Sequence, residues 1–396
     1  MKPLLVSVLP RPPHASRDGL AIRNYHLLRA LAQDFRVRAF SLLDPVRAYG
    51  QGEIPEGVEI DWVPQPSRGL RRVAAAAVSL ATGRSYSELL YRSPDLAQRI
   101  SAIAAADRPR WIVAHSYHVA PAALSAGSPV WIDFHNLDSQ IWERVAAAAT
   151  SFSVATFARL QAPRVRTFER RLVSRAAGLS CVSAKDAEAL RALGPASEPV
   201  VVANGVDLSR YAFRPAPSGE EAVFFVGDLS WPPNAEAIRW FASQVWPVVR
   251  RLRPSARAEI LGRGAPGDLA RFAASDFVLL GEGADTRPYW ERAAVAVVPL
   301  LAGGGSRLKI LEAAACGVPV VSTPVGAEGL ELVADSEILL REDPAGFAAA
   351  VAGLLANPET ARRQAAAARA HVEALYDWER IGREFARELS RPRERR

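Results

Sequence analysis

The chain has 396 residues, of which 49% are hydrophobic and 23% charged, an ordinary composition for a globular protein of two domains. Its two cysteines, Cys181 and Cys316, lie far apart and no Cys or His residues cluster, which excludes a disulfide framework and the common zinc motifs. No segment approaches the ~20 apolar residues that span a bilayer.

The N-terminal apolar run, about seven residues before the first prolines, is too short for the core of a signal peptide. We therefore expect a cytoplasmic protein. Residues 1–205 carry 25 Lys and Arg against 17 Asp and Glu, whereas residues 206–396 carry 24 against 25. A basic first half predicts an anionic partner, such as a membrane surface, a nucleic acid or a phosphorylated substrate. Nucleic acid is disfavoured because no recognised binding motif is present.

In the first half, short apolar runs alternate with helical stretches. The first run, residues 4–10, ends in a proline-rich loop, and apolar residues at helical spacing then predict a helix over residues 18–35. This alternation predicts a doubly wound parallel sheet, whose ligands bind beyond the carboxyl ends of its strands. Further strands are predicted at VRAFSLL (37–43), RWIVAHS (110–116), VWIDFHN (130–136), GLSCVS (178–183) and PVVVANGVD (199–207).

The same pattern restarts after a Pro/Gly/Ser linker at residues 214–220. The tail from Asp343 to Leu389 is predicted to be almost wholly helical, with Asp343 and Asn357 capping helices that begin at prolines. We therefore predict two Rossmann-like domains facing a cleft, residues 1–205 and 206–376. Strands of the second domain are predicted at AVFFVGD (222–228), ARAEILGRG (256–264), FVLLGEG (277–283), VAVVPL (295–300), VPVVSTP (318–324) and SEILLRED (336–343).

Residues 303–317, GGGSRLKILEAAACG, join a strand to a predicted helix over about 307–315. Ser306 is the expected N-cap, and Arg307 and Lys309 place two cations in the first turn, where the helix dipole disfavours them unless an anion compensates. A diphosphate is such an anion, and the glycines let backbone N–H groups approach it. Glu312 would accept hydrogen bonds from ribose or sugar hydroxyls. The alternative is a flexible turn with a Lys309–Glu312 surface pair.

Gly262, Gly264 and Gly267 match the dinucleotide-binding spacing G-x-G-x-x-G after a predicted strand. Pro266 and Asp268 interrupt the position where an unbroken helix should begin. We therefore favour a second glycine loop beside a nucleotide over NAD binding, and expect no cofactor.

The chain resembles the retaining GT-B glycosyltransferases of group 1, or family 4, over nearly its whole length. The specific part is VAVVPLLAGGGSRLKILEAAACGVPVVSTPVGAEGL (295–330), and it is similar to the branch with a GGGxRxKxLEA motif, which is linked to exopolysaccharide and cell-envelope assembly. Looser matches are VFFVGDLSWPPNAEAIRWF (223–241), WIDFHNLDSQIWERVA (131–146), VANGVD (202–207) and Trp378. The resemblance implies a GT-B fold whose last helix, about residues 377–390, crosses back to the first domain.

The family's functional positions can be carried over to this chain. The resemblance implies that Glu312 binds the ribose, that the backbone from Ser306 to Leu308 holds the diphosphate, and that Gly262 lies beside the nucleotide. Gly227, in the loop after the first strand of the second domain, is also assigned to the donor. Gly19 would approach the phosphate or sugar from the first domain, and His135 would lie by the anomeric carbon as the catalytic residue.

Two positions depart from the family pattern. Most members carry a Glu that contacts the donor sugar where this chain has Gly304, and an Arg and a Lys in the loop where it has only Asp228. We expect Arg307 and Lys309 to replace those phosphate-binding charges, and Glu328 to be the nearest substitute for the sugar contact. The alternative for Glu328 is a surface loop.

The chemistry expected is metal-independent, because no D-x-D motif is present to hold a metal on the diphosphate. His135 remains open between a catalytic and a merely structural role. His115 and His118 are expected to be structural or peripheral, and Asp138 and Glu143 to be solvated helix residues rather than acceptor-orienting groups.

The leading hypothesis is a glycosyltransferase that moves a sugar from a nucleotide-sugar to a cell-envelope acceptor with retention. The alternatives are a non-catalytic subunit that binds nucleotide-sugar or lipid in an envelope assembly complex, and a GT-B-shaped epimerase, which would need paired carboxylates around the sugar.

Residues 159–175 carry six arginines against Glu169 alone, interleaved with apolar residues. This segment makes the inner face of the cytoplasmic membrane a candidate partner.

Overall fold

The computed structural model describes residues 2–43, 52–65, 68–148, 152–214, 219–283, 285–302 and 308–392. The chain divides into two compact units. Unit 1 comprises residues 1–203 together with 379–396, and unit 2 comprises residues 204–378.

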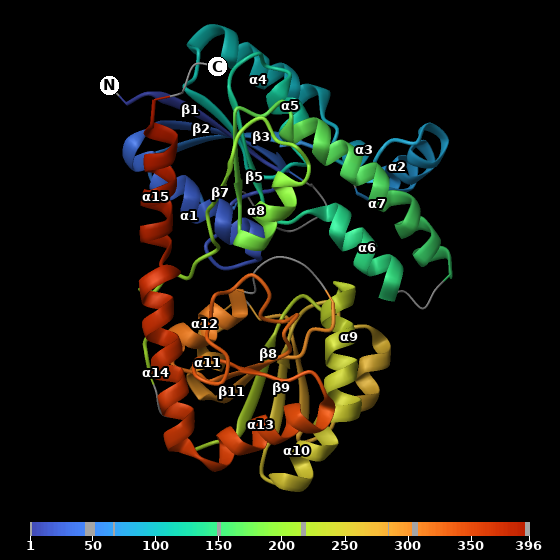
Figure 1. Ribbon diagram of the computed structural model, residues 1–396, viewed down its shortest axis with the longest axis vertical. Coiled ribbons are helices and arrows are strands. Elements are labelled where there is room, and N and C mark those ends of the chain that lie inside the picture. The colour runs from blue at the N-terminus through green and yellow to red at the C-terminus, as the bar shows by residue number, and fades with distance from the viewer. Residues whose placement is uncertain are drawn as a thin grey trace. The chain divides into compact units, whose positions relative to one another are not determined.

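Unit 1 is built on a parallel sheet of seven strands in the order β3-β2-β1-β4-β5-β6-β7. Every strand predicted in the first half is present, and β3, an edge strand, is an addition to them. Helices cover both faces of the sheet (Figure 1). In chain order the elements are β1 (Leu4–Leu9), α1 (Gly19–Asp34), β2 (Arg36–Leu43), β3 (Val58–Pro64), α2 (Arg68–Thr82), α3 (Tyr86–Leu90), α4 (Pro94–Asp107), β4 (Trp111–Ala114), α5 (Ala120–Leu124), β5 (Val130–Phe134), α6 (Asp138–Ala148), α7 (Phe152–Val173), β6 (Gly178–Cys181), α8 (Ala184–Arg191) and β7 (Pro199–Val201).

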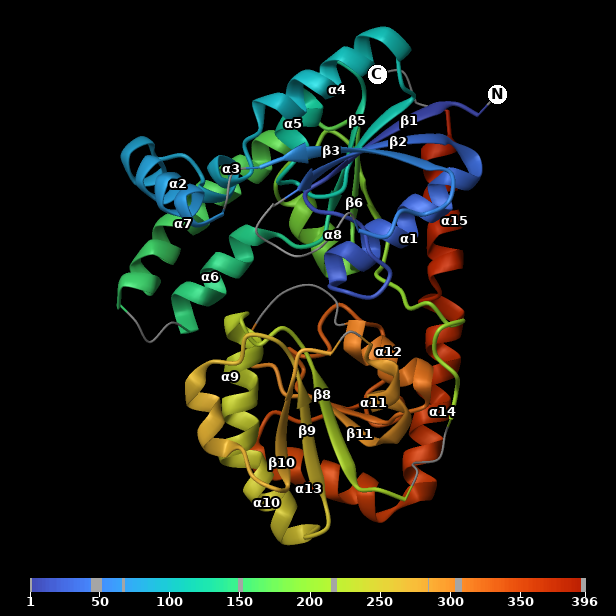
Figure 2. The same ribbon diagram turned by 180° about the vertical axis from the view of Figure 1, so that it is seen from behind.

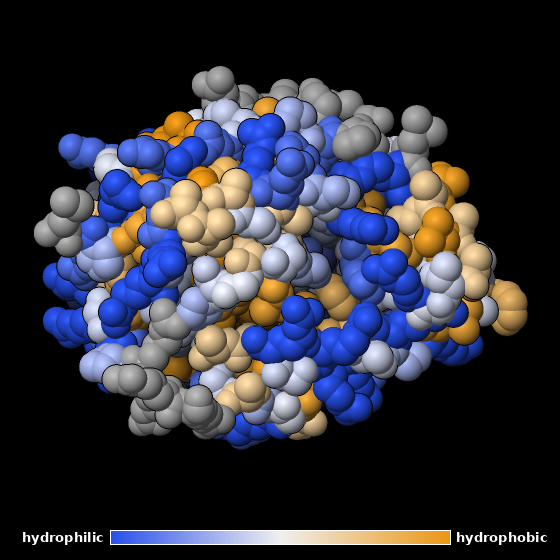
Figure 3. All heavy atoms as spheres, turned by 90° about the horizontal axis from the view of Figure 1, so that it is seen from above, coloured by the Kyte–Doolittle hydropathy of each residue, from blue (hydrophilic) through white to orange (hydrophobic). Residues whose placement is uncertain are grey.

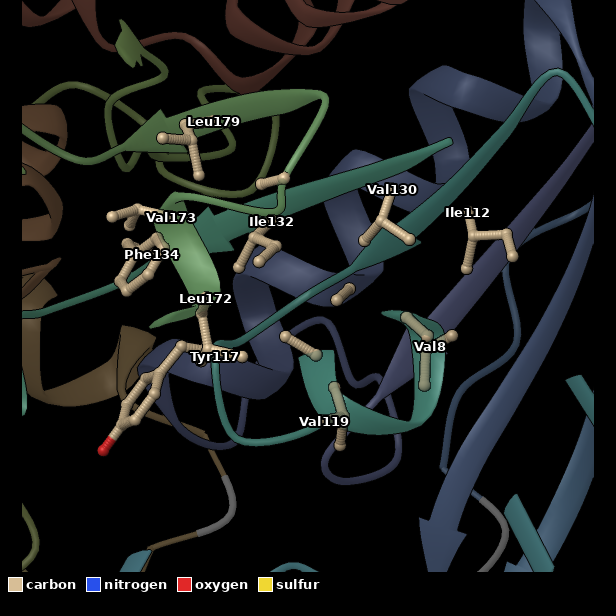
Figure 4. Close-up of a cluster of buried hydrophobic side chains, with 14 of the residues drawn as sticks. Val8, Ile112, Tyr117, Val119, Val130, Ile132, Phe134, Leu172, Val173 and Leu179 are labelled. Atoms are coloured by element: carbon tan, nitrogen blue, oxygen red, sulfur yellow. The ribbon is translucent and has the colours of Figure 1, made fainter. Parts of the chain in front are cut away.

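The core of unit 1 forms where the central strands meet the helices. β1, β4 and β5 are buried along their whole length, as parallel strands covered on both faces should be. Figure 4 shows Ile132 and Phe134 of β5 beside Leu172 and Val173 at the end of α7. The end of α7 therefore packs on the sheet that carries the predicted catalytic histidine.

Unit 2 has a parallel sheet of six strands in the order β10-β9-β8-β11-β12-β13. Asp343 and Asn357 cap helices that begin at Pro344 and Pro358, as the sequence predicts, by accepting from the backbone N–H groups of Gly346 and Thr360. The elements are β8 (Ala222–Val226), α9 (Pro232–Trp240), the π-helical turn Phe241–Val245, α10 (Trp246–Leu252), β9 (Arg257–Leu261), the 3-10 helix Gly267–Phe272, β10 (Phe277–Gly281), α11 (Arg287–Arg292), β11 (Ala293–Val298), α12 (Leu308–Cys316), β12 (Val320–Ser322), β13 (Leu339–Leu340), α13 (Pro344–Ala356) and α14 (Pro358–Leu375).

The last helix, α15 (Trp378–Ser390), packs on α1 in unit 1, and Figure 1 and Figure 2 both draw the two helices side by side. A Cβ atom added to Gly382 would come 2.4 Å from Cβ of Ala30, so the two helices approach closely there. The indole of Trp111 also donates to the Leu389 carbonyl at 2.9 Å. The predicted return of the chain to the first domain is confirmed.

Candidate functional site

Both sheets have a topological switch point, where the strand order reverses and ligands of doubly wound folds usually bind. In unit 2 the reversal lies between β8 and β11. β8 is followed by Gly227, and β11 leads through residues 299–307 into α12, which carries Lys309 and Glu312. The predicted donor residues of unit 2 therefore gather at the edge of the sheet where a ligand is expected.

Gly227 and Gly262 follow neighbouring strands, β8 and β9, and their backbones are in close contact. A Cβ atom added to Gly262 would come 2.1 Å from the Gly227 carbonyl oxygen, which no side chain can do. One added to Gly227 would come 2.8 Å from Nζ of Lys309 and 2.9 Å from Nδ2 of Asn234. Glycine at 262 is thus required by the neighbouring backbone, and a side chain at 227 would displace the Lys309 ammonium group and the Asn234 amide.

Lys309 is the second residue of α12 and reaches back over the end of β8. Its Nζ lies 4.0 Å from the centroid of the Phe225 ring and 3.4 Å from Oδ1 of Asn234, a hydrogen-bond contact at long range. Asn234 is itself buried and donates to the Asp228 carbonyl at 2.9 Å. The ammonium group is therefore held by a ring face and an amide oxygen beside two glycine loops, a setting that leaves it able to receive an anion.

Glu312 lies one turn further along α12 and is partly buried. Its Oε2 accepts from the indole N–H of Trp290 at 3.1 Å. Burial raises the pKa of its carboxyl group, and hydrogen bonds from Trp290 and the Tyr211 hydroxyl and the charge of Lys309 oppose that rise. The carboxylate is thus fixed in place by two neutral donors, as a group that receives ribose hydroxyls should be.

The predicted N-cap Ser306, together with Arg307 and Gly304, lies outside the described residues. The described part of α12 begins at Leu308, one residue after the predicted start. Roles for these three positions therefore remain predictions.

Asp228 does not stand alone in the loop after β8. Arg263, from the loop after β9, donates to its Oδ2 through Nη2 at 2.7 Å and Nε at 3.0 Å. Burial opposes ionisation, but the hydrogen bonds from Arg263 and Ser230 outweigh it and lower the pKa of the Asp228 carboxyl. The loop after β8 thus lacks a cation of its own, but Arg263 of the adjacent loop, after β9, supplies one beside Asp228. A 3-10 helix follows at Gly267, in place of the long helix that a dinucleotide fingerprint requires.

Glu328 follows β12 in a turn at the same carboxyl edge of the sheet. The turn is tight: a Cβ atom on Gly326 would lie 2.3 Å from Oγ of Ser322, and the Gly326 N–H donates to the Thr323 hydroxyl. Glu328 is partly buried in this turn, and its role stays a prediction.

In unit 1, His135 follows β5 and is tied to a buried ion pair. Asp133 of β5 and Arg23 of α1 meet through two hydrogen bonds of 2.8 Å, with side chains only 0% and 1% exposed. His135 Nε2 lies 3.0 Å from Oδ2 of the same carboxylate. Ser180 donates to Asp133 at 2.7 Å, and Nη1 of Arg23 donates to the Ala203 carbonyl at 3.0 Å. The two charged groups are therefore both paired and hydrogen-bonded to their surroundings.

The surroundings of His135 lower its pKa and so favour the neutral ring. Burial opposes ionisation of Asp133, yet the charge and hydrogen bonds of Arg23 hold its pKa well below the usual value. Burial lowers the pKa of His135, although Asp133 pulls in the other direction. Because Asp133 is ionised, the Nε2 atom that faces it carries the proton, which leaves Nδ1 as a hydrogen-bond acceptor.

A second polar cluster of unit 1 differs in part from what the sequence predicts. The hydroxyl of Tyr117 donates to Asp138 at 2.6 Å, and Nε2 of His118 lies 3.4 Å from the same carboxylate. Asp138 is about one-fifth exposed, so the expectation of a solvated helix residue is wrong for it, because Tyr117 and His118 cover it. Glu143 does behave as a surface residue, half exposed and paired with Arg166. The remaining ring, His115, is structural: it is buried against Ser7, and burial lowers its pKa to about 3.

Gly19 is the first residue of α1, directly after the N-cap Asp18, and it is exposed. Within the described ranges, no three His, Cys, Asp or Glu side chains gather in a way that would hold a metal ion.

Models of known protein families match both halves of the chain. A family model described as Glycosyltransferase Family 4 matches residues 17–210, and one described as Glycosyl transferases group 1 matches residues 220–357. The chain belongs to this family. These glycosyltransferases have the GT-B fold, and both units described above are its Rossmann-like parts.

Individual relatives are more distant. The glycogen synthase of Mycobacterium tuberculosis is 30% identical over 217 residues, 51% of each chain. An uncharacterized 44.6 kDa protein in the cps region of Klebsiella pneumoniae is 24% identical, over 40% of this chain and 43% of that one. The chain thus spans about half the length of the curated relatives it matches. The structure of Anabaena HepE with UDP and glucose shares the fold, with a TM-score of 0.69 at 15% identity over 98% of this chain and 99% of that one.

Proposed function

We propose that the chain is a retaining glycosyltransferase, which moves a sugar from a nucleotide-diphosphate sugar to a cell-envelope or exopolysaccharide acceptor without a metal ion. The observation that carries this proposal is Lys309, held at the switch point of unit 2 between Phe225, Asn234 and two obligatory glycines. A family relative in a cps region supports a polysaccharide acceptor. HepE, solved with UDP and glucose, makes UDP-sugars the first donors to test.

In the proposed reaction the acceptor hydroxyl attacks the anomeric carbon from the face that the diphosphate leaves. The bond from the anomeric carbon to the phosphate oxygen breaks, the new glycosidic bond forms, and the departing phosphate oxygen takes the acceptor's proton. Lys309 and the N-terminal end of α12 stabilise the charge that develops on the diphosphate. In this scheme that electrostatic effect is the protein's main contribution to lowering the activation barrier. We assign Gly227 and Gly262 to the close approach of backbone to the nucleotide, and Gly19 to the same role in unit 1.

His135 is proposed to act through Nδ1, the ring nitrogen that does not face Asp133 and can accept a hydrogen bond. Its Nδ1 would receive a hydrogen bond from a sugar hydroxyl near the anomeric carbon, and so orient the sugar for attack. Asp133 and Arg23 are positioning residues in this scheme, because they fix the ring and its tautomer.

Lys309→Ala should weaken binding of the nucleotide diphosphate about 10–100-fold, because a charge-assisted hydrogen bond to phosphate is lost. Glu312→Gln should weaken binding of the nucleoside diphosphate, because its ribose loses a hydrogen-bond acceptor, and should leave the affinity for inorganic diphosphate unchanged. Calorimetry on both variants measures this, with Lys185→Ala as the control because Lys185 is an exposed lysine of unit 1. Unchanged affinity in both Lys309→Ala and Glu312→Gln would refute this placement of the donor. Binding without transfer of a labelled sugar would favour the non-catalytic subunit.

Gly304→Glu should change sugar preference more than nucleotide affinity, because the family Glu contacts the sugar and Gly304 cannot. A hydrogen bond to a sugar hydroxyl contributes about 0.5–1.5 kcal/mol, so the chain as it stands should discriminate weakly between epimers. Calorimetry of UDP and its sugar conjugates on the two proteins checks this. If the unmodified chain binds a single epimer and Glu328→Ala leaves that preference intact, the sugar is recognised elsewhere.

A further inference from the structure

Unit 1 carries an apolar surface on two neighbouring helices, which we name the α2–α7 surface. Of the 13 large apolar side chains exposed among the described residues, six belong to it: Val73, Val78 and Leu80 of α2, and Phe152, Val154 and Leu160 of α7. Val73 is 72% exposed and Phe152 is 82% exposed. Figure 1 and Figure 2 both draw α2 and α7 side by side, and Figure 3 shows orange atoms among blue ones at the right-hand edge, where Figure 1 places these helices.

Direct hydrogen bonds join the two helices. Gln161 donates to Oγ of Ser79 at 2.8 Å, and Arg164 donates to the Ser79 carbonyl at 2.7 Å. Val78 and Leu80 are adjacent to Ser79 in α2, and Leu160 is adjacent to Gln161 in α7, so exposed apolar residues of both helices lie near this contact. The exposed apolar residues named above therefore belong to two helices in direct contact.

Helix α2 exposes its larger apolar side chains, which is unusual for a helix that packs on a protein core. A surface helix normally buries its larger apolar residues and exposes its polar ones. Among the side chains of α2 whose burial the structure describes, Ala75 and Ser79 are buried, while Val73, Ala77 and Leu80, at i, i+4 and i+7, share one exposed face. Val73, Val78 and Leu80 thus contribute little to the core of unit 1, which indicates that they are covered by something else.

The charge around this surface is mainly positive. Between Asp61 and Glu88 the sequence contains no acidic residue, and it contains four arginines, Arg68, Arg71, Arg72 and Arg84. Between Phe152 and Phe168 it again contains none, with Arg159, Arg164 and Arg166 present. Arg72 and Arg159 are exposed. Glu88 pairs with Arg84, and Glu143 pairs with Arg166, so two of these arginines already have carboxylate partners. An apolar stripe flanked by an excess of arginines is the pattern of a helix that lies in a lipid headgroup region.

We propose that the α2–α7 surface docks on an anionic lipid bilayer, with α2 lying in the headgroup layer. A second copy of the chain is a poorer occupant, because a two-fold contact of this surface with itself would bring arginine against arginine.

The surface differs from the one that the sequence suggested. In residues 159–175 the apolar side chains Val165, Phe168 and Leu172 are buried in the core, so that segment offers the lipid only its arginines and Leu160. The proposal does not depend on the proposed reaction, although docking would bring the chain to a lipid-linked acceptor.

The test is co-sedimentation of the full chain with vesicles of phosphatidylglycerol and phosphatidylcholine, against vesicles of phosphatidylcholine alone. We expect binding to the anionic vesicles only, weakening as salt rises. Val73→Asp with Leu80→Asp should reduce binding at least tenfold, and Arg72→Glu with Arg159→Glu should reduce it about fivefold or more for each arginine. The matched control is Leu252→Asp with Val333→Asp, which alters two equally exposed apolar residues of unit 2, 54% each.

The donor affinity and the thermal unfolding temperature of each variant are also compared with those of the unmodified chain. A variant that fails to fold, or that has lost the donor site, is thereby recognised separately. Equal binding to both vesicle types, no binding to either, or unchanged binding by the Val73/Leu80 variant would each overturn the proposal. Light scattering supplies the remaining outcome. A concentration-dependent dimer that the Val73/Leu80 variant abolishes, without vesicle binding, would assign the surface to a second copy and overturn the lipid proposal.

Discussion

Replacing Arg23 with methionine should destabilise unit 1 by about 3–5 kcal/mol, because it leaves the carboxylate of Asp133 buried without its partner. The pair is fully enclosed, with side chains 1% and 0% exposed, and two hydrogen bonds of 2.8 Å join it. Arg23 also satisfies the Ala203 carbonyl, which would lose a donor. Denaturant unfolding, with hydrogen exchange of the β1 and β5 amides to identify the transition of unit 1, measures the loss.

The control for Arg23→Met is Arg38→Met. Arg38 pairs with Asp61 at 3.0 Å, but both side chains are 39% exposed, so water replaces the lost partner and the cost should be at most about 1 kcal/mol. Replacing both members of the buried pair, by Arg23→Met with Asp133→Leu, should cost less than Arg23→Met alone because no charge is left behind. Equal losses for Arg23→Met and Arg38→Met would show that the buried pair is not held as described.

Most of both sheets is predictable because parallel strands buried on two faces appear in the sequence as unbroken apolar runs. LLVSVL in β1 and AAVAVV in β11 are examples, and both are buried throughout. β3 escapes prediction because it is an edge strand in which only Val63 of VEIDWVP is buried. Its residues alternate in polarity and leave no apolar run to detect.

The candidate site divides in the same way. The placement of Lys309 and Glu312 after β11 is predictable because the strand, loop and helix that carry them are consecutive, so the signal lies within a short stretch of sequence. Gly227 and Gly262 each follow directly on a strand that the sequence predicts. The ion pair of Arg23 with Asp133 joins residues 110 positions apart, and no local pattern marks either as a partner of the other. The burial of Asp138 escapes prediction for the same reason, since Tyr117, which donates to it, lies 21 residues away. Buried polar networks depend on the tertiary fold, and single-sequence patterns do not contain it.

Glu169→Gln should stabilise unit 1 increasingly as pH rises, because Glu169 is a carboxyl group that the fold keeps protonated. The residue lies on α7 and is fully buried, and burial raises its pKa to about 7, although the Oγ and backbone N–H of Ser139 donate to it at 2.5 and 3.2 Å. Its ordinary pKa is near 4.5. Between those two values the unfolded chain releases the proton and the folded chain keeps it, so the unfolding free energy of the unmodified protein falls as pH rises.

The glutamine introduced by Glu169→Gln retains an oxygen to accept from the Ser139 N–H and an amide to donate to the Ser139 hydroxyl, but it does not titrate. The unfolding free energy of Glu169→Gln, relative to the unmodified chain, should therefore rise by about 3 kcal/mol between pH 4.5 and 7 and change little above pH 7. Comparing two proteins at each pH removes the contribution of His115, which titrates in both. Glu143→Gln, which replaces a half-exposed carboxylate on the adjacent helix, supplies the baseline. A difference that stays constant across this range would mean that Glu169 is ionised in the folded state, with a cation or water reaching it beneath α6.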